Sequence, residues 1–70
     1  MPIEASISEG VSLLRLPAVL ARTGLSRSAV YLAIQRGEFP KPMHIAGTRA
    51  SLWDSRAIDL WVADVLKGAA

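Results

Sequence analysis

The longest periodic pattern of apolar positions lies near the carboxyl end of the chain. Apolar residues recur there at the i, i+3, i+4, i+7, i+8 spacing that lines one face of an α-helix: Ile58, Trp61, Val62, Val65 and Leu66. Asp54 or Ser55 precedes this run, and both are residue types that cap a helix through a side-chain oxygen. The pattern therefore predicts a final amphipathic helix whose apolar face packs on the core.

Two shorter helices joined by a tight turn are predicted upstream. The first spans residues 17–23 and begins with a proline, which suits the first helical turn because it has no amide hydrogen to leave unpaired. Gly24 follows, where helices commonly end in a left-handed conformation. Ser26 is placed to cap a second helix over residues 27–36. The interval between the two helices is that of a turn, not of a linker.

The second helix has one apolar and one more polar face. At about 100° per residue, Val30, Ala33 and Ile34 share one side. The opposite arc holds Ser28, Tyr31, Leu32 and Gln35. We expect the first set to pack against the core and the second to face outward.

A small β-hairpin is predicted after the second helix. Pro40 and Pro42 cannot continue a helix, since each lacks an amide donor and pushes its predecessor toward extended geometry. Residues 43–45 and 50–53 are short strand candidates, and the connection between them contains the glycine that a tight hairpin needs. Arg49 is expected near the tip of this hairpin. Large side chains are needed to stabilise so small a domain, so Trp53 and Trp61 are expected in the core.

Length and composition place these elements in one domain. The chain has 70 residues, and we expect a mobile arm over residues 1–12, a folded domain over 13–67 and a frayed end over 68–70. It contains no cysteine, so neither a disulfide nor a cysteine-ligated zinc stabilises it. No apolar run approaches the length of a membrane span, and no basic leader precedes one. These features predict a cytoplasmic protein with no membrane partner.

Positive charge is concentrated in the middle of the chain. The formal net charge is only +2, but residues 15–49 carry six Lys and Arg against a single acidic residue, Glu38. Their net charge is +5, whereas the segments before and after them are net negative. A basic segment of this kind favours a polyanionic partner.

The predicted elements together form a winged helix-turn-helix, a mainly α fold with a small β-hairpin. In such a unit the second helix enters the DNA major groove, where Gln35 can pair with adenine and Leu32 can contact a thymine methyl group. Arginine and amide hydrogens at the start of this helix suit a phosphate. The predicted DNA-binding residues are Ser26, Arg27, Ser28, Tyr31, Leu32, Gln35, Arg36, Lys41, His44, Thr48 and Arg49.

Two segments, Thr23-Gly24-Leu25-Ser26-Arg27-Ser28 and Phe39-Pro40-Lys41-Pro42, resemble the AlpA family of prophage regulators, within a likeness that covers about residues 13–66. The resemblance implies a MerR-like winged helix-turn-helix that acts for a mobile element. Its role is either transcription regulation or excision as a recombination directionality factor, with an integrase of the tyrosine recombinase class as partner. By position it assigns DNA contact to Ser26, Arg27, Ser28 and Tyr31 and to the wing around Thr48 and Arg49. The chain departs from the family pattern at Leu32, where relatives usually carry a basic residue.

Other functions are weaker candidates on this sequence. Catalysis is disfavoured because the acidic residues are scattered, a single histidine is present, and no metal-ligand or phosphate-loop spacing occurs. No cofactor, metal or small-molecule ligand is expected. A protein-interaction module, either antitoxin-like or a complex subunit that turns its basic face to an acidic partner, remains the alternative. His44 fits a structural or exposed role better than a phosphate contact.

Leu60 points away from the face that its own helix buries. It lies between Asp59 and Asp64 on the outer side of the last predicted helix. We expect it to contact a second copy of the chain bound alongside on DNA, with the protein associated with the nucleoid. Double-stranded DNA and self-association are thus the predicted interactions.

Overall fold

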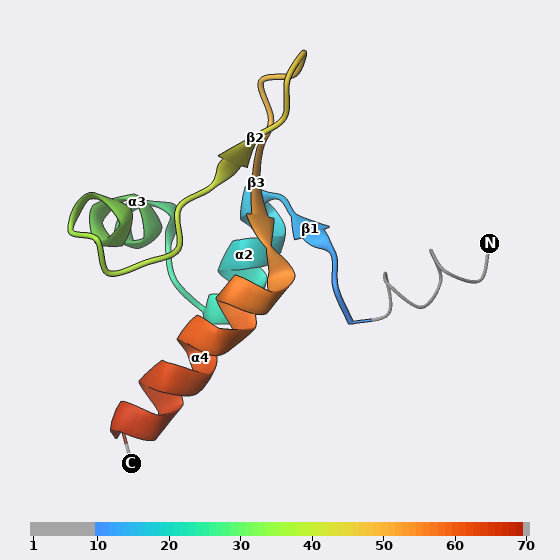
Figure 1. Cartoon of the computed structure of the whole chain (residues 1–70). Coiled ribbons are helices and arrows are strands. Elements are labelled where there is room, and N and C mark those ends of the chain that lie inside the picture. The colour runs from blue at the N-terminus through green and yellow to red at the C-terminus, as the bar shows by residue number, and fades with distance from the viewer. Residues whose placement is uncertain (1–9, 70) are drawn as a thin grey trace.

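The computed structural model describes residues 10–69; most of the predicted arm, residues 1–9, and the last residue lie outside the described residues. The elements follow in the order β1 (Leu13–Leu14), α2 (Leu16–Thr23), α3 (Arg27–Gln35), β2 (Met43–His44), β3 (Ser51–Asp54) and α4 (Ser55–Ala69). Figure 1 shows α2 at the centre, α3 on one flank, and the β2–β3 hairpin projecting from the amino-terminal end of α4. The arrangement is mainly helical, with the predicted helix-turn-helix followed by a wing.

Local signals account for the boundaries of the helix-turn-helix. Gly24 takes a left-handed conformation, with φ of 75°, and its amide donates to the Leu20 carbonyl over 2.8 Å, which ends α2. The Ser26 side chain accepts a hydrogen bond from the Ala29 amide at 3.1 Å and caps α3. Both features were expected from the residue types, and they fix the short turn that orients α3 against α2.

The sheet extends beyond the predicted hairpin. Its order is β1-β3-β2 and both pairings are antiparallel, so β1 adds to the hairpin as a third strand. Ser12 belongs to this folded part although it falls in the predicted arm. Its amide donates to the Ser55 hydroxyl at 2.8 Å and its carbonyl accepts from the Ser55 amide at 2.9 Å. The folded domain therefore includes residue 12.

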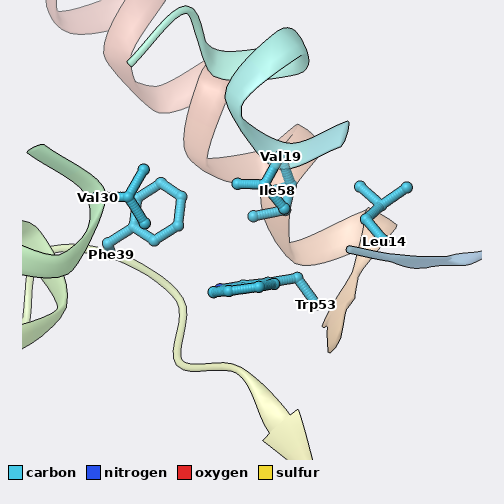
Figure 2. Packing of buried hydrophobic residues seen from close by; sticks show 6 residues of the cluster. All are labelled: Leu14, Val19, Val30, Phe39, Trp53 and Ile58. Carbon is cyan, nitrogen blue, oxygen red and sulfur yellow. The ribbon is translucent and has the colours of Figure 1, made fainter. Parts of the chain in front are cut away.

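The three helices, the strands β1 and β3 and the connection after α3 contribute to the core, which is centred on Trp53, whereas both residues of β2 are exposed. The buried apolar residues are Leu14, Val19, Val30, Phe39, Trp53 and Ile58. In Figure 2 the Trp53 indole lies beneath Val19 and Ile58, with Leu14 to one side and Val30 with Phe39 to the other. The indole is fully buried, and its Nε1–H donates to the Pro40 carbonyl over 3.0 Å. Trp53 thus joins the sheet, the helices and the connection after α3.

The predicted apolar face of α4 is buried only in its first half. Ile58 is fully buried and Trp61 is partly buried, but Val65 and Leu66 expose 46% and 66% of their surface. The prediction that these two residues pack inward is wrong, because α4 runs on beyond the body of the molecule (Figure 1). The helix also continues to Ala69, so residues 68 and 69 are helical where a frayed end was expected.

Candidate nucleic-acid interface

Helix α3 presents the predicted outward arc to solvent. Val30 on the opposite side is fully buried in the core and anchors the helix. Tyr31 and Leu32 expose 42% and 47% of their surface, and Ser28 and Gln35 are exposed as well. One accessible surface therefore carries Ser28, Gln35, Tyr31 and Leu32. The polar side chains can form hydrogen bonds with base edges, and the leucine can contact a thymine methyl group.

The first turn of α3 favours an anion. Arg27 and Ser28 are exposed there, and no acidic residue is present in the turn. The Ser26 side chain satisfies the Ala29 amide, whereas the earlier amides of the helix have no intrahelical acceptor. An anion at the start of α3 is attracted by these free donors, by the positive end of the helix dipole and by the Arg27 guanidinium. A DNA phosphate is the matching ligand for such a helix start.

The wing tip is held by a tight turn. The Thr48 amide donates to the Ile45 carbonyl at 3.0 Å, and Gly47 adopts the left-handed conformation, with φ of 85°. The Thr48 hydroxyl also donates to Ile45 at 3.1 Å and accepts from the Ala50 amide at 3.2 Å. Thr48 is therefore engaged in shaping the turn, and the exposed Arg49 follows it directly.

Ion pairs within the described residues do not involve the cations of α3 and the wing. In the part of the chain that the structure describes, the ion pairs are Arg22–Asp59 at 2.8 Å and Arg56–Asp54 at 2.9 Å. The hydrogen bond from the Arg56 side chain lowers the pKa of Asp54 below its ordinary value. Within the same residues, no acidic side chain pairs with the exposed cations of the predicted interface, which are Arg27, Arg36, Lys41 and Arg49. Their charge remains available to a polyanion.

The remaining predicted site residues lie in two places. His44 is exposed on β2 and pairs with Ser51 of β3, and it belongs to the wing. Leu60 lies on α4, where it exposes 67% of its surface and lines a hollow together with the connection after α3. The structure thus brings the predicted DNA-binding residues onto α3, the connection after it and the wing. It places Leu60 on α4, beside that connection.

Sequence reasoning missed an apolar pair on the wing. Met43 and Ile45 expose 45% and 44% of their surface, and in a strand residues two apart lie on one side. The apolar-polar-apolar order of Met43, His44 and Ile45 is the sequence signal that could have identified this pair. The wing therefore carries apolar as well as cationic groups.

Other kinds of site find little support in the described residues. Across residues 10–69, no three His, Cys, Asp or Glu side chains gather in a way that could hold a metal ion. None of the helices described is long and apolar enough to cross a bilayer.

Comparisons with known proteins agree with this geometry. The family model described as "Prophage CP4-57 regulatory protein (AlpA)" matches residues 12–66. A curated relative, "Uncharacterized protein ORF88" of Enterobacteria phage P4, is 36% identical over 55 residues, which are 79% of this chain and 61% of the phage protein. The chain therefore spans about three fifths of the length of that relative. No solved structure matches the chain significantly.

Proposed function

The chain belongs to the family of the prophage CP4-57 regulatory protein (AlpA), and from this premise we propose that it is a double-stranded DNA-binding regulator of a mobile element. The observation that carries the proposal is the joint placement of an exposed polar arc on α3 and of four cations on α3, its following connection and the wing that have no ion-pair partner among residues 10–69. The family match extends from Ser12 through the whole helix-turn-helix and wing.

Each part of the surface has a distinct role in this proposal. Ser28, Tyr31, Leu32 and Gln35 enter the major groove and contact base edges. Arg27 at the start of α3, together with Arg36 and Lys41, binds phosphates and sets the register. Arg49, with His44 and Thr48, places the wing on the adjacent backbone or minor groove. The protein acts by binding, and no residue is assigned a catalytic role.

Salt dependence tests the DNA-binding proposal directly. If Arg27, Arg36, Lys41 and Arg49 neutralise four phosphates, the plot of log K against log salt concentration should have a slope of about −3.6 on duplex DNA. Fluorescence anisotropy with a labelled duplex over a salt series measures this slope. Replacing any one of these four residues by Gln should make it shallower by about 0.9.

The same titration separates DNA binding from the alternative of an acidic protein partner. A chain that uses its basic face for a protein would show weak, sequence-indifferent binding to duplex DNA even at low salt. That result, or a slope near zero, contradicts the proposal. Arg56→Gln is the matched control, because this arginine is paired with Asp54 on another part of the molecule and its loss should leave the slope unchanged.

We infer two possible outputs for the bound protein, excision of the mobile element and transcription regulation. As an excisionase, or recombination directionality factor, it would act with an integrase of the tyrosine recombinase class. An in vitro excision assay with and without this chain, using the integrase of the same element, distinguishes them. Stimulated excision supports the first output. Unchanged excision together with altered promoter activity supports the second.

We also propose that several copies bind side by side. One winged unit of this size makes few base contacts, so useful affinity needs more than one unit on adjacent sites. Leu60 exposes 67% of its surface on α4 and is not among the residues assigned to DNA. An exposed leucine is ordinary by itself, but this one adjoins partly buried Trp61 and so extends an apolar surface.

Leu60→Ser should weaken binding to a duplex with two sites while leaving binding to a single site unchanged. The physical reason is the loss of apolar area at the contact between copies, worth about fivefold in cooperativity. Gel-shift titrations on one-site and two-site duplexes measure both quantities. Leu66→Ser is the matched control, since Leu66 is equally exposed, at 66%, on the projecting end of the same helix. Equal losses on both duplexes would contradict the assignment of Leu60.

A further inference from the structure

An open groove lies between α4 and the connection that follows α3. We call it the α4 groove; its hollow measures about 350 Å³ and is lined by Phe39, Pro40, Leu60 and Trp61 together with Glu38 and Asp64. Its floor is firmly held. The Phe39 and Trp61 rings meet edge to face with centroids 5.0 Å apart, and the Trp61 Nε1–H donates to the Glu38 carbonyl at 2.9 Å. The groove is therefore a preformed apolar surface.

The rim of the α4 groove is acidic. The side chains of Glu38 and Asp64 are exposed on the two walls. Among residues 10–69 the ion pairs involve other carboxylates, Asp54 and Asp59, so both rim carboxylates are without a partner there. An apolar floor between two unpaired carboxylates suits a segment that combines an aliphatic side chain with a cation.

The chain itself has a segment that combines an aliphatic side chain with a cation, and this segment is β1 with the residue that follows it. Leu13 in β1 exposes 51% of its surface, whereas Leu14 is buried. Arg15 follows in an extended conformation, with ψ of 165°, and is exposed without an ion pair among the described residues. In an extended stretch, residues two apart point the same way. Leu13 and Arg15 therefore form one outward apolar and cationic edge, which we call the β1 edge.

The two surfaces lie apart on the molecule. In Figure 1, β1 and α3 with its following connection lie on opposite sides of the central helix α2. Neither surface includes a residue assigned to DNA contact, although one wall of the α4 groove is the connection between Arg36 and Lys41. One chain therefore cannot join its own two surfaces, but two chains can join one of each.

We propose that the α4 groove of one copy receives the β1 edge of a second copy, with Leu13 against Leu60 and Trp61 and with Arg15 between Glu38 and Asp64. The proposal rests on the proposed DNA-binding function and names the surfaces through which neighbouring copies meet. Because two different patches join, the contact is head-to-tail and leaves a free patch at each end. It therefore supports binding to direct repeats, whereas a symmetric contact would favour inverted repeats.

Charge reversal tests the proposal. Arg15→Glu should lower cooperativity on a two-site direct repeat about fivefold, since an attraction becomes a repulsion and exposed ion pairs are individually weak. Adding Glu38→Lys and Asp64→Lys should restore cooperativity to within about twofold of the unmodified chain. A binding site is first selected by this chain from a pool of random duplexes. The probes then carry two copies of that site, in direct or inverted orientation, with spacings around one helical turn.

Lys67→Glu provides the matched control. It makes the same change of charge at an exposed position on α4 that is not part of the lining of the groove, and it should leave cooperativity unchanged. Cooperativity is the ratio of two-site to one-site affinity, so any general effect of charge on DNA binding cancels. The proposal is overturned if Arg15→Glu lowers cooperativity and the added Glu38→Lys and Asp64→Lys changes do not restore it. It is also overturned if cooperativity occurs only on inverted repeats.

Site-directed cross-linking gives a second readout that does not require DNA. The chain has no cysteine, so one population can carry Leu13→Cys and another Leu60→Cys. Under oxidation of a concentrated mixture, disulfides between the two populations should exceed those within either one. The head-to-tail contact is overturned if disulfides form mainly between two Leu60→Cys chains, or if disulfides between the two variants are no more frequent than those within each. Absence of duplex binding by the unmodified chain would instead overturn the proposed function, while the cross-linking result would still decide the contact.

Discussion

Trp53→Ala is expected to leave most of the chain unfolded in dilute buffer at room temperature. Trp53 is fully buried, lies at the centre of a core formed by the three helices, β1, β3 and the connection after α3, and donates its indole N–H to the Pro40 carbonyl. Truncating a buried aromatic side chain to alanine costs about 3–5 kcal/mol. The core of so small a domain rarely supplies more than about 3–5 kcal/mol of net stability. The loss is therefore comparable with the whole free energy of unfolding.

Circular dichroism during urea and thermal titration measures this effect. Leu60→Ala is the control, because its side chain is mostly exposed and surface changes usually alter stability by less than about 0.5 kcal/mol. The variant at Trp53 should show little cooperative unfolding, whereas the Leu60 control should follow the unmodified chain. A cooperative transition for Trp53→Ala within a few degrees of the unmodified chain would show that the core does not depend on this residue.

Features of the fold that depend on neighbouring residues could be predicted from the sequence. The cap at Ser26, the left-handed glycine at position 24 and the outward arc of α3 follow from residue type and helical period. The hairpin follows from the prolines before it and the glycine within it. These signals depend on residues a few positions apart, so contacts with distant parts of the chain do not change them. The contacts of α3 and the wing with DNA remain predictions.

Features that depend on distant residues could not be predicted. Arg22 counts toward the positive charge of the middle segment, but Asp59, 37 residues away in sequence, pairs with it. The pairing of β1 with β3 also joins distant parts of the chain, and nothing local in two leucines specifies it. Val65 satisfies the helical period but is exposed, since periodicity does not say where the neighbouring elements end.

The double variant Arg27→Gln with Arg49→Gln is expected to lose more than a hundredfold in affinity for duplex DNA at low salt. One arginine lies at the start of α3 and the other follows the turn at the wing tip, so the two changes remove separate phosphate contacts and their effects should add. A hydrogen bond to a charged group contributes about 1.5–3 kcal/mol. Two such losses give at least about 3 kcal/mol, and each tenfold change in affinity corresponds to about 1.4 kcal/mol.

The slope of log K against log salt concentration distinguishes loss of these contacts from loss of folding. It should become shallower by about 1.8, because two phosphates are no longer neutralised, while the thermal unfolding transition stays in place since both side chains are exposed. Arg56→Gln with Lys67→Gln removes the same total charge from α4 and should retain nearly full affinity. If this control loses as much affinity as the double variant, net charge and not the placement of Arg27 and Arg49 governs binding, and the surface formed by α3 and the wing is not the DNA-binding face.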